Sequence, residues 1–199
     1  MRRLLIATNN SGKIRELRAL LGEFELDLIT PQDAGLRLSV LEDGDSYQAN
    51  AEKKAAAFAS AGGMMALADD SGLEVDALEG APGLHSARFV GRSDATDADR
   101  RKALLDALTG KPRPWTARFR CAVAIAAPGG KTSSFEGMCP GEIIPKERGS
   151  AGFGYDPVFL VGSTGMTMAE LDLKAKNRLS HRAMAVANAG PFLRQLFGE

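Results

Sequence analysis

The stretch Ala68-Asp69-Asp70-Ser71-Gly72 follows the apolar run Met64-Met65-Ala66-Leu67. The apolar run predicts a buried strand, and Ser71-Gly72 predicts the turn that ends it. Adjacent carboxylates repel each other and are poor residues for a strand interior, so we expect both at the strand's end, held by a cation or used on a substrate. Strand ends in α/β folds open onto loops that carry ligand chemistry. An acidic strand-to-turn junction, capped by its own side chains, explains the same residues without a ligand.

The composition is that of an ordinary globular domain. The chain has 199 residues, of which 44% are hydrophobic and 25% charged, enough for one large domain with a substantial core. Lys plus Arg and Asp plus Glu both number 25, so no global positive field gathers nucleic acid. The apolar run Leu4 to Ala7 is too short for a signal peptide, and no stretch approaches membrane-spanning length. We expect a cytoplasmic protein that binds neither nucleic acid nor membranes.

The N-terminal residues predict a strand, a polar turn and a helix. Leu4 to Ala7 is typical of a strand buried on both faces, and Ile14 to Leu21 has helical periodicity with Asn10 or Ser11 as its cap. The unpaired N–H groups and dipole of the helix attract anions, and Lys13 adds a positive charge. The spacing of a P-loop is absent. The turn therefore predicts either a phosphate site or an ordinary capped helix.

The rest of the chain predicts a mixed α/β sheet in a single domain, residues 1–199. Pro128-Gly129-Gly130 joins two strands as a β-hairpin, which adds an antiparallel pair. The strands expected beyond the N-terminal one are 24–30, 64–70, 116–127, 131–139 and 158–161. The helices expected are 46–61, 97–108, a short one after the capping box Thr167 to Glu170, and a C-terminal one capped by Ser180. Cys121 and Cys139 lack metal-ligand spacing and predict core residues.

Three groups of side chains along these elements point to chemistry. Asn50 shares a helix face with Lys53, Lys54 or both, although a solvated lysine face is the simpler explanation of these lysines. Phe153 lies between two glycines with a ring face suited to stacking on a planar ligand, unless it folds back onto the core. A third group, at the start of the last helix, consists of cations that oppose the helix dipole, which favours an electron-rich ligand. This group is Lys176, His181 and Arg182.

These motifs together resemble the inosine triphosphate pyrophosphatase family, also called XTP/dITP diphosphatases. The matching stretches cover nearly the whole chain in the family's order: Thr8 to Lys13, Glu42 to Gly44, Asn50 to Ala55, Ala68 to Leu73, Gly80 to Gly83, Ser86 to Arg88, Gly152 to Pro157 and Ser180 to Arg182. The resemblance implies hydrolysis of ITP, dITP and XTP to monophosphate and diphosphate with Mg²⁺, by a protein that is usually a homodimer. It also implies an elongated mixed sheet flanked by helices, in two lobes with a nucleotide cleft between them.

The resemblance also implies roles for individual residues. Asp70 is expected to orient or deprotonate the attacking water and to bind Mg²⁺ with Glu42, with Asp69 as a further metal or supporting residue. The residues expected to hold the triphosphate are Thr8, Asn10, Lys13, Lys53 and Ser71. Lys176, His181 and Arg182 are expected to donate to the 6-keto group of the purine, Phe153 to stack on its ring, and Asp156 to accept a ring N–H or orient the basic residues. The full set expected to bind the purine is Phe153, Gly154, Tyr155, Asp156, Lys176, His181 and Arg182.

Three positions depart from the family's pattern, and one of them, Ala151 in place of a common glycine, is expected only to tighten its loop. Ala49 replaces a Glu that members commonly carry before Asn50-Ala51, which makes Glu42 more important as a carboxylate. His85 stands where an apolar or aromatic residue is expected, and we interpret it as a loop or packing histidine. Two other functions stay open: a diphosphatase for modified pyrimidine nucleotides, and a nucleotide-binding protein without hydrolysis. The Ala49 departure is the only feature that favours the second.

Overall fold

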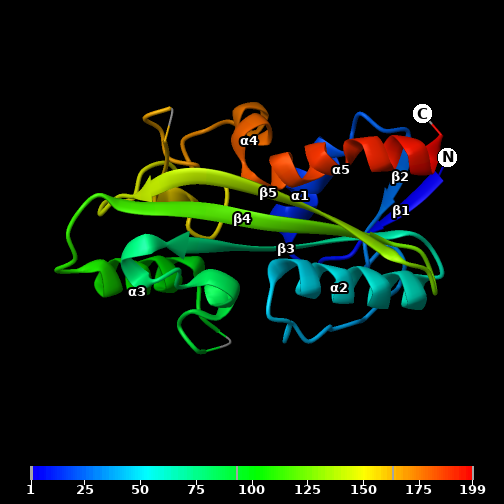
Figure 1. Ribbon diagram of the computed structural model, residues 1–199, viewed down its shortest axis with the longest axis horizontal. Helices are drawn as coiled ribbons and strands as arrows, with labels where there is room; N and C mark the ends of the chain where they lie inside the picture. The colour runs from blue at the N-terminus through cyan, green and yellow to red at the C-terminus, as the bar shows by residue number, and fades with distance from the viewer. Residues whose placement is uncertain (1, 93, 163, 199) are drawn as a thin grey trace. The chain divides into compact units, whose positions relative to one another are not determined.

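The computed structural model describes residues 2–92, 94–162 and 164–198 of an α/β protein (Figure 1). Within these residues, six strands pair in the order β2-β1-β3-β4-β5-β6. The strands are β1 (Arg2–Ile6), β2 (Leu26–Ile29), β3 (Ala66–Val75), β4 (Trp115–Ala126), β5 (Thr132–Ile143) and β6 (Phe159–Val161). The helices are α1 (Ser11–Leu20), α2 (Tyr47–Gly62), α3 (Asp97–Leu108), α4 (Leu173–Leu179) and α5 (His181–Phe197), with 3₁₀ turns η1 (Asp76–Leu78), η2 (Gly83–Arg88) and η3 (Asp156–Val158). β1 runs parallel to β2 and β3, and β5 antiparallel to β6, so the predicted mixed sheet is confirmed.

The chain divides into two compact units. Unit 1 comprises Met1–Asp70, Cys121–Gly137 and His181–Glu199, and unit 2 comprises Ser71–Arg120 and Met138–Ser180. Three of the boundaries fall inside the strands β3, β4 and β5, and one falls between α4 and α5. No linker composition marks such boundaries, because a strand has the same apolar pattern on both sides of them. The sequence alone therefore indicates no division.

Unit 1 packs helices against both faces of its strands (Figure 1). α1 and α5 cover one face, where Leu17 and Leu193 pack with Leu4 and Ile6 of β1 in one apolar cluster. α2 covers the other face with residues four apart, and its alanines allow a close approach. The residues of this buried face are Tyr47, Asn50, Ala51, Lys54, Ala55, Phe58 and Ala59. Asn50 and Lys54 are thus carried inward by an otherwise apolar surface.

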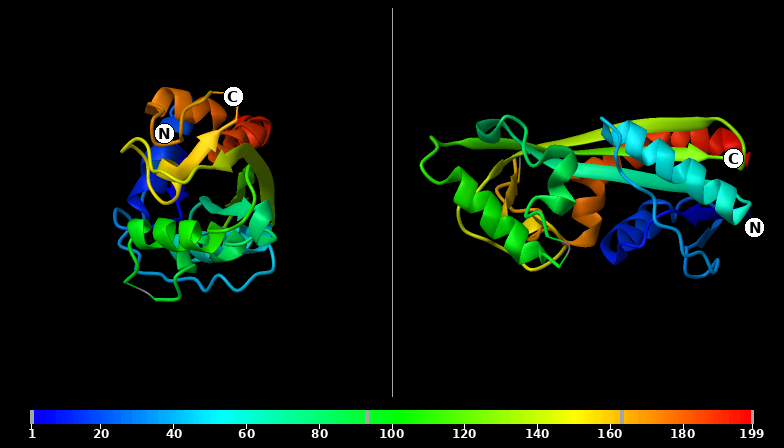
Figure 2. Two further views of the ribbon diagram at one scale, coloured as in Figure 1. Left: turned by 90° about the vertical axis from the view of Figure 1, so that its left-hand side faces the viewer. Right: turned by 90° about the horizontal axis from the view of Figure 1, so that it is seen from below.

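Unit 2 has its own apolar core. Leu104 and Leu108 of α3 pack against Leu73 and Val75 of β3, together with residues of β4 and β6. The rings of Phe119 and Phe159 lie 4.5 Å apart, tilted by 47°, an arrangement favoured by the aromatic quadrupole. Figure 2 shows the strands and loops of this unit beside α3.

Three predicted helix caps are confirmed. Asn10 caps α1 by accepting the Lys13 N–H, and Ser46 caps α2 by accepting the Ala49 N–H. Thr96 and Asp99 form a reciprocal capping box at the start of α3. Cys121 and Cys139 are buried and free, as predicted. In the part of the chain that is described, no helix is long and apolar enough to cross a membrane.

Two local predictions are wrong. Ser71-Gly72 does not turn the chain, because β3 continues through it to Val75. Thr167 and Glu170 form only half of the predicted capping box, and they do so in a turn. The Glu170 carboxylate accepts the Thr167 N–H at 2.7 Å, but Thr167 Oγ1 donates to Arg148 O. These tertiary bonds hold the segment out of a helix, and α4 begins only at Leu173.

Candidate active site

The turn after β1 forms the first part of the site. The Ala7 N–H donates to Leu67 O at 2.7 Å, which places the end of β1 beside the start of β3. The Asn10 N–H donates to Thr8 Oγ1 at 3.2 Å, and Asn10 Oδ1 accepts the Lys13 N–H at 3.0 Å. Thr8 is partly exposed and Asn10 is exposed. The predicted polar turn is therefore ordered, and it leads directly into the N-terminus of α1.

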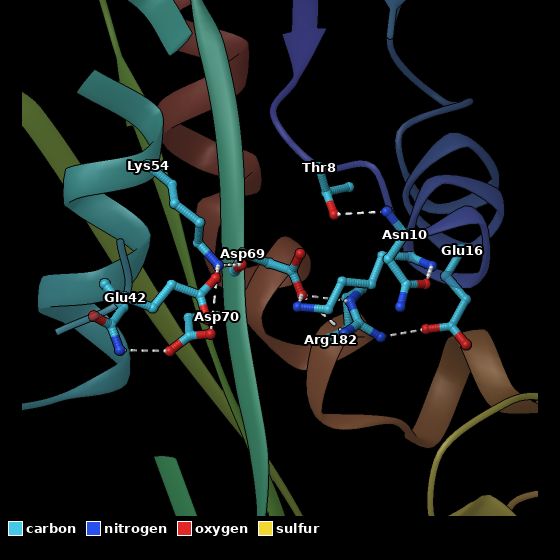
Figure 3. Close-up of polar contacts among 10 residues, drawn as sticks. Thr8, Asn10, Glu16, Glu42, Lys54, Asp69, Asp70 and Arg182 are labelled. Atoms are coloured by element: carbon cyan, nitrogen blue, oxygen red, sulfur yellow. Dashed lines mark hydrogen bonds and ion pairs between the residues drawn. The ribbon is translucent and has the colours of Figure 1, made fainter. Parts of the chain in front are cut away.

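Asp69 and Asp70 project from opposite faces of β3 (Figure 3). Successive side chains alternate across a strand, so Asp69 shares the face of Leu67, which belongs to the cluster under α1 and α5. Asp70 shares the other face, over α2. The single step along the strand gives the two carboxylates different neighbours.

The Asp69 face carries a network of four charges, of which Glu16, Asp69 and Arg182 are buried. Arg182 donates to Asp69 Oδ2 from Nε at 3.0 Å and Nη2 at 2.8 Å, and Lys13 Nζ lies 3.1 Å from the same oxygen. Arg182 Nη1 also pairs with Glu16. Burial alone raises the pKa of the Asp69 carboxyl, but Lys13 and Arg182 hold it well below its usual range. Two anions thus balance two cations between α1, β3 and α5.

The Asp70 face is organised by Lys54 (Figure 3). Its ammonium donates to Glu42 Oε1 at 2.7 Å and to the Asp69 carbonyl oxygen at 2.6 Å, and it lies 3.4 Å from Asp70 Oδ1. Burial lowers the pKa of Lys54, but Asp70, Asp69 and Glu42 together raise it above its ordinary value. This lysine therefore keeps its charge between two carboxylates.

Asn50 completes the Asp70 face from one helical turn before Lys54. Its Nδ2 donates to Asp70 Oδ2 at 3.1 Å, and its Oδ1 accepts the Gly44 N–H at 2.8 Å. A Cβ at Gly44 would come within 2.8 Å of that Asn50 oxygen, so glycine lets the loop approach the helix. Burial is the largest influence on Asp70 and raises the pKa of its carboxyl, while Lys54 opposes the rise.

A second polar cluster lies in unit 2. Asp156 is buried, and its Oδ2 accepts the Phe153 N–H at 2.9 Å and a bond from Lys176 Nζ at 2.5 Å. Lys176 Nζ also lies 5.2 Å from the centroid of the Phe153 ring. Tyr155 faces the core, where its hydroxyl donates to Ser86 O at 2.9 Å. The Phe153 ring therefore lies beside a buried ion pair, whereas the Tyr155 side chain has a structural position.

Several predicted site residues have positions that the sequence pattern did not indicate. Lys53 forms a half-exposed pair with Asp43 at 2.6 Å, and the neighbouring Lys54 is the lysine that reaches Asp70. Both lysines are compatible with the spacing from Asn50. The buried alanine face of α2 would have distinguished them, because it contains Asn50 and Lys54 but not Lys53. The sequence also does not indicate Glu16 as a site residue, because a charged residue on a helix is ordinarily exposed.

The predicted group of three cations at the start of the last helix is also wrong in part. Lys176 lies in the last turn of α4, where a cation is favoured by the helix dipole, and pairs with Asp156. His181 and Arg182 do begin α5, and both are buried. The Arg182 side chain is engaged by Glu16 and Asp69. Ser71 follows Asp70 in β3 and is partly exposed, and His85 is exposed on η2.

The carboxylates fit a magnesium ion that is bound together with a substrate. In residues 2–92, 94–162 and 164–198, no three His, Cys, Asp or Glu side chains gather as a metal site. Mg²⁺ is commonly bound by one or two carboxylates, substrate phosphates and water, and Glu42 with Asp70 supplies such a pair. Asp69 Oδ1 is buried without a hydrogen-bond partner among the described residues, but its carboxylate lies on the other face of β3 and is neutralised there. The geometry therefore favours Glu42 and Asp70 over Asp69.

Comparison with known proteins agrees with the predicted resemblance. Residues 4–192 match the model of the Ham1 family. The chain is 46% identical over 187 residues to the dITP/XTP pyrophosphatase of Geobacter sulfurreducens, with 94% of each chain covered. It is 40% identical over 193 residues to the dITP/XTP pyrophosphatase of Bacillus subtilis, covering 97% of this chain and 98% of that one.

Solved structures show the same fold. A HAM1 protein from Coxiella burnetii has a TM-score of 0.87 at 36% identity, over 98% of this chain and 100% of that chain. The Ham1 protein of Staphylococcus aureus has a TM-score of 0.85 at 35% identity, with the same coverage. The sequence match and the structural match both extend over nearly the full chain. The chain therefore belongs to the Ham1 family.

Proposed function

We propose that this chain is a dITP/XTP pyrophosphatase that hydrolyses ITP, dITP and XTP to the nucleoside monophosphate and diphosphate. The observation that carries the proposal is the grouping of Asp70 with Lys54 and Glu42 on one face of β3, in a chain whose relatives bear that name. A carboxylate held beside a cation can take a proton from water while the cation balances charge that develops on phosphate.

In the proposed reaction, Asp70 orients a water molecule and takes its proton. The water oxygen bonds to the α-phosphorus, and the bond from that phosphorus to the bridging oxygen breaks, so that diphosphate leaves. Lys54 fixes the Asp70 and Glu42 carboxylates, and Asn50 holds the second oxygen of Asp70. Glu42 and Asp70 would hold Mg²⁺, which supplies electrostatic stabilisation of the phosphate oxygens when bound.

The turn Thr8 to Lys13 is proposed to bind the triphosphate. It combines a hydroxyl, an amide, a lysine and the N-terminus of α1, which are donors suited to phosphate. Lys13 Nζ contacts Asp69 at 3.1 Å, and an ammonium group has three donors, so it can bind a phosphate oxygen as well. The roles of Lys53 and Ser71 in triphosphate binding stay predictions.

Purine binding is proposed for the unit 2 cluster of Phe153, Asp156 and Lys176. The ring offers a stacking surface, and the ammonium is a donor for an acceptor oxygen such as the purine 6-keto group. Because Tyr155 and Arg182 have buried structural partners, we expect their backbone groups, rather than their side chains, to be available to a ligand. Contributions of Gly154 and His181 are proposed on the family resemblance alone, as are the homodimer and the cytoplasmic location.

Product analysis tests the function directly. The protein is incubated with ITP and Mg²⁺, and IMP and diphosphate are expected in equal amounts. IDP with orthophosphate would contradict the proposed bond cleavage. A panel with dITP, XTP, GTP, ATP and modified pyrimidine triphosphates separates the alternatives: preference for a pyrimidine would indicate the related diphosphatase activity. Tight ITP binding without hydrolysis at any Mg²⁺ concentration would indicate a binding protein.

A further inference from the structure

The loop 147–156 in unit 2 carries Phe153 and Asp156 and is rich in glycine. Gly149, Gly152 and Gly154 have φ angles of 78°, 78° and 62°, a region that favours glycine. Glycine has the largest conformational freedom of any residue, so a loop with three of them loses much entropy when it becomes ordered. The bond from the Phe153 N–H to Asp156 Oδ2 provides some of this order within the loop, and contacts with the surrounding structure provide more.

Two side chains of α3 bind both polar groups of Gly154. Asp97 Oδ2 accepts the Gly154 N–H at 2.7 Å, and Arg101 Nη1 donates to the Gly154 carbonyl oxygen at 2.9 Å. Asp97 and Arg101 are four residues apart and therefore lie on one face of the helix. The loop runs beside α3 within unit 2 (Figure 2). These bonds hold the peptide groups directly after Phe153.

Arg101 also reaches the other end of the loop. Its Nε donates to Glu147 Oε1 at 2.9 Å, so one guanidinium joins Glu147 to Gly154. The Arg101 side chain is 14% exposed, so its bond to Gly154 is partly buried, whereas the Glu147 side chain is 45% exposed and that bond lies at the surface. A planar guanidinium, whose donors have fixed positions, can bond to both Glu147 and Gly154 more readily than a flexible ammonium can.

The start of α3 is itself well anchored. Arg100 Nη1 lies 2.5 Å from Asp97 Oδ1 and its Nε donates to Ala87 O at 2.9 Å. The capping box of Thr96 and Asp99 fixes the first turn of the helix. Asp97 therefore presents its Oδ2 to the loop from a rigid element.

We propose that Asp97 and Arg101 are positioning residues that order the loop 147–156 before the nucleotide binds. The loop then loses its conformational entropy when the protein folds and not when the nucleotide binds, and Phe153 and Asp156 already have the positions that purine binding requires. This inference rests on the proposed function, because it assigns Phe153 and Asp156 to nucleotide binding. The residues act through the loop and do not themselves contact the reacting atoms.

The test compares variants within one helix. Asp97→Ala and Arg101→Ala remove the hydrogen bonds to Gly154. The control variants, Asp106→Ala and Lys102→Ala, remove a solvent-exposed ion pair of 2.6 Å on the same helix. We expect amide hydrogen exchange in 147–156 to become about tenfold faster in the first two variants and to stay unchanged in the controls. The KM for ITP is expected to rise about tenfold with kcat within about twofold, because the loop contributes equally to substrate and transition-state binding.

Conservative variants allow the same measurements if an alanine variant does not fold. Asp97→Asn retains an oxygen that can accept the Gly154 N–H and is expected to restore most of the protection. Arg101→Lys can reach only one of its two partners and is expected to be intermediate in exchange and KM. Unchanged exchange in the loop of the folded Asp97 and Arg101 variants would overturn the proposal, as would faster exchange with an unaltered KM. A wild-type protein that releases no diphosphate from ITP would instead overturn the proposed function, and the exchange data would still decide whether α3 orders the loop.

Discussion

Asp69 and Asp70 are adjacent in sequence but have opposite electrostatic surroundings. Asp69 contacts two cations on its face of β3, and Asp70 shares one lysine with Glu42 on the other. A strand alternates its side chains, so a pair of neighbouring carboxylates need not repel at close range if each face brings its own cation. This arrangement explains how both carboxylates can lie inside β3, although the sequence predicts that the strand ends at this pair.

Replacement of Asp70 by Asn tests its role as the base. The amide has the same shape but cannot take a proton from water, so diphosphate release from ITP is expected to fall by about 10³-fold or more. Asn50 and Lys54 bond to different oxygens of Asp70, and the single amide oxygen can accept from one of them, so the variant should fold with a modest fall in the thermal unfolding midpoint. Asp43→Asn, which alters an exposed carboxylate paired with Lys53, serves as the control and should keep its activity. A near-native rate for the Asp70 variant would remove this residue from the chemistry.

A comparison of Lys54→Met with Lys53→Met tests which lysine serves the site. Methionine keeps an apolar stem but removes the charge, leaving Glu42 and Asp70 without their shared cation. Turnover of ITP is expected to fall about 10²-fold or more in the Lys54 variant. The Lys53 variant loses only an exposed pair, so its kcat/KM should stay within about threefold. The reverse order would restore the triphosphate role that the sequence predicts for Lys53.

At the scale of elements, sequence reasoning succeeds where the information is local. The turn after β1, the Asn10 and Ser46 caps and the Thr96 capping box each depend on bonds within a few residues, and all are predicted from their residue types. The continuation of β3 past Ser71 depends on β4, its neighbour in the sheet, which begins only at Trp115. The choice of Lys54 depends on which face of α2 is buried. The first cannot be read from a short window, because a distant strand decides it, whereas the second is indicated locally by the four-residue spacing of Ala51, Ala55 and Ala59.

The packing of α1, β3 and α5 is stabilised by ion pairs as well as by apolar contacts. Arg182 from α5 reaches Glu16 on α1 and Asp69 on β3, all three being about 1% exposed. Removal of one member of a buried ion pair leaves another charge uncompensated, which costs more than the pair contributes as a whole. The network therefore fixes the relative positions of these three elements within unit 1.

Replacement of Glu16 tests that network. Glu16→Ala is expected to lower the free energy of unfolding by about 3–5 kcal/mol, because Arg182 then stays buried with one carboxylate fewer. Glu16→Gln, which still accepts a hydrogen bond, should cost less. Glu23→Ala on the exposed surface after α1 is the control, with a change of about 0.5 kcal/mol or less. Urea denaturation at neutral pH measures all three. A Glu16→Ala variant as stable as the Glu23 control would show that the buried charges are compensated in another way.

At the scale of the whole molecule, the course of the chain couples the two units. β3, β4 and β5 each contain residues of both units, so neither unit consists of one continuous segment. A part of the chain cannot be removed from one unit without cutting strands that belong to the other. We therefore expect the molecule to unfold as one cooperative body, although each unit has its own apolar core.

The two cysteines provide a probe in each unit for this expectation. Burial raises the pKa of Cys121, in unit 1, to about 12 and that of Cys139, in unit 2, to about 11. Since the thiolate is the reactive form, and unfolded cysteine ionises near pH 8.5, neither thiol should react with a disulfide reagent at pH 8 until its surroundings open. In a urea series, single Cys→Ala variants report each thiol separately. Because three strands pass through both units, labelling of both thiols should begin at the same urea concentration as the loss of far-ultraviolet circular dichroism. Labelling of one thiol at clearly lower urea would show that its unit opens independently.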